Sequence, residues 1–123
     1  MTVFGVGSPH PRTYGTFARV LGSYVRERNI LSLEEAIKKM TSLPARILSI
    51  NKRGLIKEGY YADIAVFDSN VIIDKATFED PHQYAEGIHS VIVNGVIVVE
   101  EGVHNGNKPG KVLRGPGYIG GNE

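Results

Sequence analysis

The feature that most constrains the fold is an Asn-Gly pair between two runs of β-branched residues. Asn94-Gly95 follows Val91-Ile92-Val93 and precedes Val96-Ile97-Val98-Val99. A two-residue turn of type I′ requires positive φ at both central positions, which asparagine and glycine accept most readily. The pattern therefore predicts an antiparallel hairpin, and Glu100-Glu101-Gly102 is expected to end it.

A second glycine-containing stretch runs from Arg53 to Asp68. Gly54 and Gly59 each provide a position where the backbone can take positive φ at no steric cost. The stretch predicts a turn, a short strand, a second glycine turn and then a strand from Ala62 to Phe67. The residues of that last run are short or β-branched and almost wholly apolar, which is typical of a strand buried on both faces.

Asp63 is the one charged residue inside this apolar run. We interpret its carboxylate as an acceptor for backbone N–H groups of the adjacent glycine turn. The alternative interpretation, a catalytic acid, requires a partner acid or a metal ligand nearby, and the sequence offers none.

The first fifty residues carry helical signals instead. Residues 1–15 are expected to form a loop, in which Pro9 and Pro11 keep the chain extended so that His10 and Arg12 project from it. A helix is predicted to begin at Thr16 as its N-cap. Its buried face is expected to be a single apolar stripe at helical spacing, formed by Phe17, Val20, Leu21, Tyr24 and Val25.

Two shorter helices are expected next. Ser32-Leu33-Glu34-Glu35 is a capping box, in which a hydroxyl and a carboxylate satisfy backbone N–H groups at the helix start. The following helix is predicted to bury Leu33, Ala36, Ile37 and Met40. Thr41 or Ser42 is then predicted to cap a third helix with Pro44 in its first turn, where the missing N–H costs little.

The spacing of apolar residues changes at Asn51, from a helical period to runs typical of strands. The sequence therefore predicts an α+β fold, with a helical segment at residues 1–50 and a β-rich lobe at residues 51–123. Residues 69–87 are irregular and acidic. The tail is rich in glycine and proline, and we expect it to be loose after about residue 115.

Composition excludes several classes of function. Fourteen Lys and Arg against thirteen Asp and Glu give a net charge of +1, so there is no overall electrostatic case for nucleic acid or an anionic membrane. The chain has no cysteine, which excludes disulfides, thiol catalysis and cysteine metal ligands. The sequence shows neither a signal peptide nor a run of about 18 apolar residues, so a cytoplasmic location is expected.

Several motifs together resemble one enzyme family. Residues 54–63 are similar to the G-x-I-x-x-G-x-x-A-D signature of the amidohydrolase superfamily. Within that superfamily, the segment from Pro9 to Leu21 resembles the N-acyl-D-amino-acid deacylases, or D-aminoacylases. The similarity extends from about residue 8 to residue 115, through the segments 32–36, 40–45, 76–78, 81–84, 93–95 and 110–115.

The resemblance implies a fold and a chemistry. The helices would be the end of a TIM-like barrel, and the β-rich lobe would be a small β-sandwich. A zinc-bound water would attack the amide carbonyl, while an aspartate upstream of the matching segment would move the proton. A (β/α)8 barrel needs about 250 residues, and the His and Cys ligands of the family are absent. We therefore expect a C-terminal portion of such an enzyme that has no metal site and no hydrolytic activity alone.

Arg12 is the one candidate site residue. In the family, the arginine of the His-Pro-Arg segment is expected to bind the α-carboxylate of the substrate, and a guanidinium suits this role because it donates two parallel hydrogen bonds. The alternative is that Arg12 is a solvated loop arginine. His10 alone cannot hold catalytic zinc, and the spacing of His82, His89 and His104 indicates no site.

Two hypotheses for function remain. In the first, the chain is a deacylase fragment that works only with a complementary N-terminal barrel chain. In the second, it is a non-catalytic module that oligomerises through the helical stripe or the edge of the β-lobe. An independent small enzyme is rejected, because no nucleophile–base pair or ligand cluster is visible.

Overall fold

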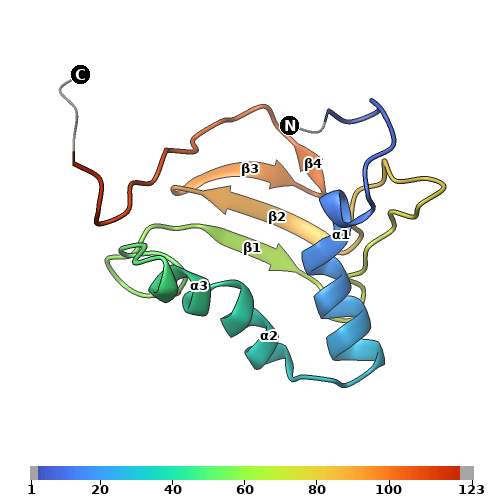
Figure 1. The fold of residues 1–123 in the computed structure, drawn as a ribbon, viewed down its shortest axis with the longest axis horizontal. Helices are drawn as coiled ribbons and strands as arrows, with labels where there is room; N and C mark the ends of the chain where they lie inside the picture. Colours follow the sequence, from blue (N-terminus) through green and yellow to red (C-terminus); the bar gives the residue numbers. More distant parts are fainter. Residues whose placement is uncertain (1–2, 120–123) are drawn as a thin grey trace.

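Four helical segments precede four strands in residues 3–119, the part of the chain that the computed structural model describes (Figure 1). The helical segments are α1 (Arg12–Arg19), the π-helix η1 (Val20–Glu27), α2 (Leu33–Met40) and α3 (Ser42–Ile47). The strands are β1 (Ile64–Phe67), β2 (Ile88–Val93), β3 (Val96–Glu100) and β4 (Val103–His104). The strands form one antiparallel sheet in the order β1-β2-β3-β4, which confirms the α+β prediction.

The Asn-Gly hairpin is confirmed. Asn94 and Gly95 have φ of 49° and 80°, and Val93 pairs with Val96 where β2 turns into β3. The hairpin ends at Glu100, as predicted, but the sheet continues beyond it. Glu101 and Gly102 also take positive φ, of 48° and 76°, and the chain reverses once more into β4.

The Arg53–Asp68 stretch forms fewer strands than predicted. Gly54 and Gly59 take positive φ, as expected, but the residues between them form turns rather than a strand, and β1 begins at Ile64. The prediction that this strand is buried on both faces is wrong, because Val66 is 46% exposed. Within the described residues β1 pairs with β2 alone, so it lies at an edge of the sheet.

The first helix departs most from prediction. It begins at Arg12, four residues before the predicted N-cap, and it continues into the π-helix. Leu21 is buried and Val20 and Val25 pack against the core, as predicted, but Phe17 is 66% and Tyr24 is 36% exposed, so the predicted stripe is only in part the buried face. The π-helix contributes to this change, because its wider turns move side chains out of a 3.6-residue period.

Small residues form the rest of the buried face. Gly15, Ala18 and Gly22 are buried along α1 and η1. A Cβ on Gly22 would lie 2.5 Å from the carbonyl oxygen of Ile72, and a Cβ on Gly15 would collide with the side chain of Asp74. The helix backbone therefore packs directly against residues 72–74.

The next two helices follow their sequence signals. The Ser32 hydroxyl accepts a hydrogen bond from the Glu35 N–H (3.2 Å) at the start of α2, and Ala36 is completely buried. α3 has Pro44 in its first turn and Thr41 at its N-cap position, as predicted, but the Thr41 side chain makes no capping hydrogen bond. The Thr41 hydroxyl instead donates to the carbonyl oxygen of Ile37.

The described core is small and joins the helices to the sheet. Its buried members are Ala18, Leu21, Ala36 and Ile72. Figure 1 shows α2 and α3 running along the β1 side of the sheet, while α1 crosses its end. In the described part of the chain, no helix is long and apolar enough to cross a membrane.

The connections and the tail have little regular structure. Residues 69–87 are irregular, as predicted, with one isolated bridge between Ile73 and Glu86. Residues 105–119 form neither helix nor strand, and the predicted loose tail is exposed as far as residue 119. Residues 120–123 of that tail lie outside the described residues.

Candidate functional site

Arg12 is the first residue of α1, and the prolines before it explain why. Pro11 lies in the helical region (φ −50°, ψ −31°), so its fixed ring geometry starts the helix instead of extending the loop. His10 Nδ1 accepts a hydrogen bond from the Arg12 N–H (3.1 Å), which satisfies a backbone donor of the first turn. His10 thus stabilises the helix start, and the expectation that Arg12 projects from an extended loop is wrong.

A pocket of about 510 Å³ opens beside Arg12. One wall is α1 with the start of η1, and the other is the irregular segment 74–79. Arg19 and Asp74 join the two walls through an ion pair of 2.8 Å, in which the Asp74 side chain is almost wholly buried. His10 packs edge-on against Phe78, with ring centroids 4.9 Å apart, and so forms part of the rim.

The charge on Arg12 has no partner within residues 3–119. No carboxylate or carbonyl of the described residues accepts a hydrogen bond from its guanidinium, which is exposed at the pocket. Arg19, in contrast, is occupied by Asp74. Glu79 also lines the pocket and is exposed. Among the charged groups here, Arg12 is therefore the one placed to bind an added carboxylate.

His82 organises a second cluster that the sequence did not reveal. Its Nδ1 accepts from the Gly5 N–H and lies 3.1 Å from the Tyr14 hydroxyl, while its Nε2 donates to the Gly7 carbonyl oxygen (2.9 Å). Phe4 stacks on Tyr84 with ring centroids 4.7 Å apart. The cluster fastens the N-terminal segment to the loop before β2. Its signal in the sequence was the local concentration of aromatic residues.

Asp63 belongs to a third cluster, at the tip of the hairpin. Its carboxylate accepts from the Asn94 N–H (2.8 Å) and forms an ion pair with Arg53. Arg53 also donates to the Asn94 side chain, which in turn donates to the Pro109 carbonyl oxygen (2.7 Å). Asp63 is thus an acceptor for backbone N–H, as interpreted, but its partner is the hairpin turn and not the adjacent glycine turn.

The environment of Asp63 lowers its pKa. Partial burial acts in the opposite direction and raises the pKa, but the hydrogen bond from the Asn94 N–H and the charge and hydrogen bond of Arg53 together outweigh it. The carboxylate is therefore ionised at neutral pH. With both oxygens bound, Asp63 has the properties of a structural group and not those of a proton donor.

The described residues do not fit a catalytic zinc site. No group of three or more His, Asp or Glu side chains lies close enough together between residues 3 and 119 to hold a metal ion. His10 and His82 are engaged in the contacts above, and His104 Nδ1 accepts from the Gly106 N–H (2.9 Å). We therefore derive no step through a metal from this chain's own residues.

Comparison with known proteins identifies the family. The sequence profile of the amidohydrolase family matches residues 4–99. The chain belongs to the amidohydrolase family. This confirms the resemblance seen in the sequence, and the relatives define it further.

Two curated relatives come from Alcaligenes xylosoxydans xylosoxydans. A D-aminoacylase is 49% identical over 85% of this chain and 22% of the relative. An N-acyl-D-glutamate deacylase is 44% identical over 92% of this chain and 23% of the relative. This amidohydrolase chain therefore spans about a fifth of the length of the curated relatives that it matches.

Solved structures agree with the curated relatives. A crystal structure of D-aminoacylase matches with a TM-score of 0.80 and 49% identity, over 81% of this chain and 21% of that one. N-acyl-D-glutamate deacylase from Bordetella bronchiseptica, in complex with zinc and a phosphonate inhibitor, matches with a TM-score of 0.73 and 46% identity, over 74% of this chain and 19% of that one. The zinc belongs to that complex, and the described residues of this amidohydrolase chain contain no group that fits it.

Proposed function

We propose that this chain forms the substrate-carboxylate side of a zinc-dependent hydrolase that acts on N-acyl-D-amino acids. One observation carries the proposal: Arg12, in a segment that resembles the deacylases, lies at the mouth of a pocket with no acceptor for its guanidinium among the described residues. The names of the relatives supply the substrate class, and the chemistry of Arg12 supplies its role.

The guanidinium would bind the α-carboxylate through two parallel, charge-assisted hydrogen bonds. The backbones of α1 and η1 lie close to residues 72–74 at Gly15 and Gly22, and this contact limits movement of the helix that carries Arg12. His10 fixes it from the N-terminal side, through the bond to the Arg12 N–H. Such fixing matters because displacement of a positioning group by about 1 Å costs an enzyme about 100-fold in rate.

Under this proposal, the zinc ligands and the catalytic aspartate are residues outside this sequence. They would lie on a complementary barrel, either in a longer chain or in a separate one. Residues 1–50 would complete the end of a TIM-like barrel, and residues 51–123 would contribute one part of a β-sandwich-type lobe. The isolated chain would then neither bind zinc tightly nor hydrolyse the substrate, and the complete enzyme would act in the cytoplasm.

The proposal can be tested by complementation. The chain is mixed with an N-acyl-D-glutamate deacylase from which the matching segment has been removed, zinc is added, and release of free D-glutamate from N-acetyl-D-glutamate is measured. We expect no release from either part alone and metal-dependent release from the mixture. Zinc-dependent release by the isolated chain would contradict the proposal that the metal ligands lie outside this sequence.

Variants assign the role of Arg12 within that assay. Arg12→Ala should raise KM by about 10-fold or more, as expected when a charge-assisted pair is lost. Glu79→Gln removes from the same pocket a negative charge that repels the substrate carboxylate, and it should lower KM slightly. Lys39→Ala, on the exposed side of α2, is the matched control and should change nothing. An unchanged KM in Arg12→Ala would identify Arg12 as a solvated arginine.

A second candidate function is a non-catalytic module that oligomerises. The observation that favours it is the exposure of large apolar side chains, among them Phe17, Val66 and Ile97, in a molecule with a small core. Association of copies would bury such side chains, and their burial would contribute favourable free energy. Light scattering at micromolar concentration should then report a multiple of the 13.4 kDa chain, and a monomer at that concentration would count against this candidate.

A further inference from the structure

Basic side chains gather in a second place, between the loop that follows α3 and the C-terminal tail. A cleft of about 680 Å³ lies there, and two smaller depressions that share Ile50 and Asn51 adjoin it. We call the three together the loop–tail cleft. Its cationic lining residues are Lys38, Arg46, Lys52, Arg53, Lys111 and Arg114.

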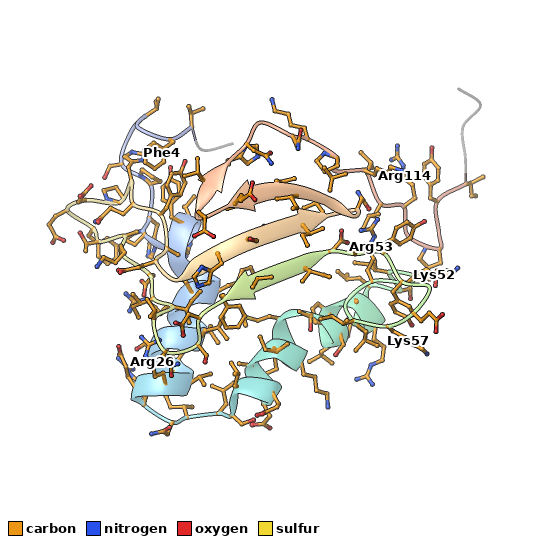
Figure 2. All side chains as sticks on the ribbon, turned by 180° about the vertical axis from the view of Figure 1, so that it is seen from behind. Phe4, Arg26, Lys52, Arg53, Lys57 and Arg114 are labelled. Carbon is orange, nitrogen blue, oxygen red and sulfur yellow. The ribbon has the colours of Figure 1, made fainter. Side chains whose placement is uncertain are left out.

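Among residues 3–119, no acidic residue lines the loop–tail cleft. The chain as a whole is nearly neutral, with a net charge of +1, so this concentration of one sign is local and not a consequence of composition. Figure 2 shows Lys52, Arg53 and Arg114 at the same end of the molecule. α1, which carries Arg12, lies at the opposite end of the fold from α3 (Figure 1).

Few of these charges are neutralised by the protein. Arg53 is bound by Asp63 and Asn94, and its guanidinium lies 4.3 Å from the centre of the Tyr61 ring. Within residues 3–119, no carboxylate forms an ion pair with Lys52, Lys111 or Arg114. Like charges held around one concave surface repel each other, and a multivalent anion would remove that repulsion.

The loop begins with the cap that ends α3. Ser49 takes positive φ (53°), and the Ile50 N–H donates to the Ala45 carbonyl oxygen (2.8 Å), as expected just after the last turn of a helix. This cap sets the direction of the chain at the loop–tail cleft, which Ser49 and Lys52 both line.

We propose that the loop–tail cleft binds a small anion that contains linked phosphate groups. A single carboxylate can bind at most one guanidinium through two parallel hydrogen bonds. A terminal phosphate group carries about −1.5 to −2 charges and three acceptor oxygens, and each phosphate linked to it adds further negative charge. The cleft volume suits a ligand with more than one such group. Leu48, Tyr61 and Leu113 add exposed apolar surface to the lining, which gives an organic part of the ligand a place to pack.

The first experiment measures binding to the whole chain by calorimetry at low salt, with tripolyphosphate, citrate and a nucleoside triphosphate as probes. We expect saturable binding of tripolyphosphate that weakens steeply as salt rises, and weaker binding of citrate. Tighter binding of the nucleotide than of tripolyphosphate would assign the ligand to organic phosphates, and equal binding to inorganic ones. Citrate binding as tight as that of tripolyphosphate would overturn the proposal.

The second experiment locates the site. Lys111→Gln combined with Arg114→Gln should weaken tripolyphosphate binding by about 10-fold or more. Lys39→Gln combined with Lys75→Gln removes the same charge elsewhere and should have little effect. Equal losses in both pairs would show that net charge alone is responsible. Lys52→Gln, on the other wall, provides an independent check, and circular dichroism verifies that each variant is folded.

The third experiment separates this proposal from the function assigned to Arg12. Arg12→Ala should leave tripolyphosphate binding unchanged, because Arg12 does not line the loop–tail cleft. The pair Lys111→Gln and Arg114→Gln should leave KM in the complementation assay unchanged. A loss of phosphate binding in Arg12→Ala would move the anion to the α1 pocket and overturn the inference, whatever the outcome for deacylation.

Discussion

The hairpin end and the α1 end of this molecule are held by different kinds of contact. At the hairpin end, Arg53, Asp63 and Asn94 form a network of directional hydrogen bonds. At the α1 end, small residues such as Gly22 allow two backbones to touch, while the large Phe17 points away from the core. The network of Arg53, Asp63 and Asn94 satisfies its own polar groups. On α1, the side chain of Phe17 stays 66% exposed within the described residues.

This difference shows that groups along one chain do not all find their contacts within it. Charged groups such as Arg53 and Asp63 bind each other wherever the fold brings them together, so their network is already complete. An exposed Phe17 costs free energy, because burial of apolar surface contributes about 25 cal/mol per Å². A second protein surface that covered Phe17 would therefore gain free energy from its burial.

The largest effect is expected from a substitution that disrupts packing at the α1 end. Gly22→Ala should lower the free energy of unfolding by about 3 kcal/mol, because its Cβ would meet the Ile72 carbonyl and the Ile73 side chain, both at 2.5 Å. Urea denaturation followed by circular dichroism measures the change. Gly110→Ala is the matched control, since no atom lies within 4 Å of the added Cβ. Equal stability of Gly22→Ala and wild type would mean that η1 does not pack on residues 72–73.

The second effect breaks the hairpin end. Asp63→Asn should lower the free energy of unfolding by about 2 kcal/mol, because it leaves the largely buried Arg53 guanidinium without its counter-charge. Glu27→Gln, at the solvated pair with Arg26 (3.9 Å), should change stability by less than about 0.5 kcal/mol. The same denaturation measurement applies to both. A smaller loss in Asp63→Asn than in Glu27→Gln would contradict the structural role of the network.

The two ends also differed in how well the sequence predicted them. Turn chemistry is local, so Asn94-Gly95 and the Ser32 cap were predicted correctly from neighbours along the chain. Burial of Phe17 and Tyr24 depends on what packs against them, and spacing alone cannot supply that surface. The π-helix was missed for a related reason, because it arises where a helix adapts to its surroundings.

The same distinction applies to the candidate site. Arg12 could be singled out from the motif, but its place in the first turn of α1 depended on Pro11 being helical, which the sequence did not reveal. The partners of Asp63 were missed because Asn94 lies 31 residues further along the chain. Contacts of this kind become visible only when the sheet brings β1 beside β2.

A third, smaller effect is the dependence of stability on pH at the hairpin end. The pKa of Asp63 is lowered in the folded state, so its contribution to stability is present above the unfolded value of about 3.9 and is lost as pH falls through the folded pKa. The starting point is pH 5, about one unit above the pKa of Asp63 in the unfolded chain. As the pH falls from there, the wild type should lose more free energy of unfolding than Asp63→Asn does. Denaturation midpoints across this range measure the difference. Parallel curves for the two proteins would show that Asp63 is not the responsible group.

The smallest effect on stability tests the exposed face of α1. Phe17→Ser removes an apolar side chain that is 66% exposed, so it should change the free energy of unfolding of the isolated chain by no more than about 0.5 kcal/mol. If this face contacts a second copy or a complementary barrel, the same change should weaken that association by about 10-fold, because a buried aromatic is a frequent anchor of interfaces.

Sedimentation of the chain alone, and titration of the chain with the barrel of the complementation assay, distinguish the two partners. Val112→Ser, an exposed apolar residue of the tail, is the matched control for surface hydrophobicity. A loss of self-association alone would favour the oligomerising module, and a loss of barrel binding alone would favour the deacylase fragment. If Phe17→Ser alters neither association, the exposed side of α1 at Phe17 is not an interface. The exposure of Phe17 would then not distinguish the α1 end from the hairpin end as a binding surface.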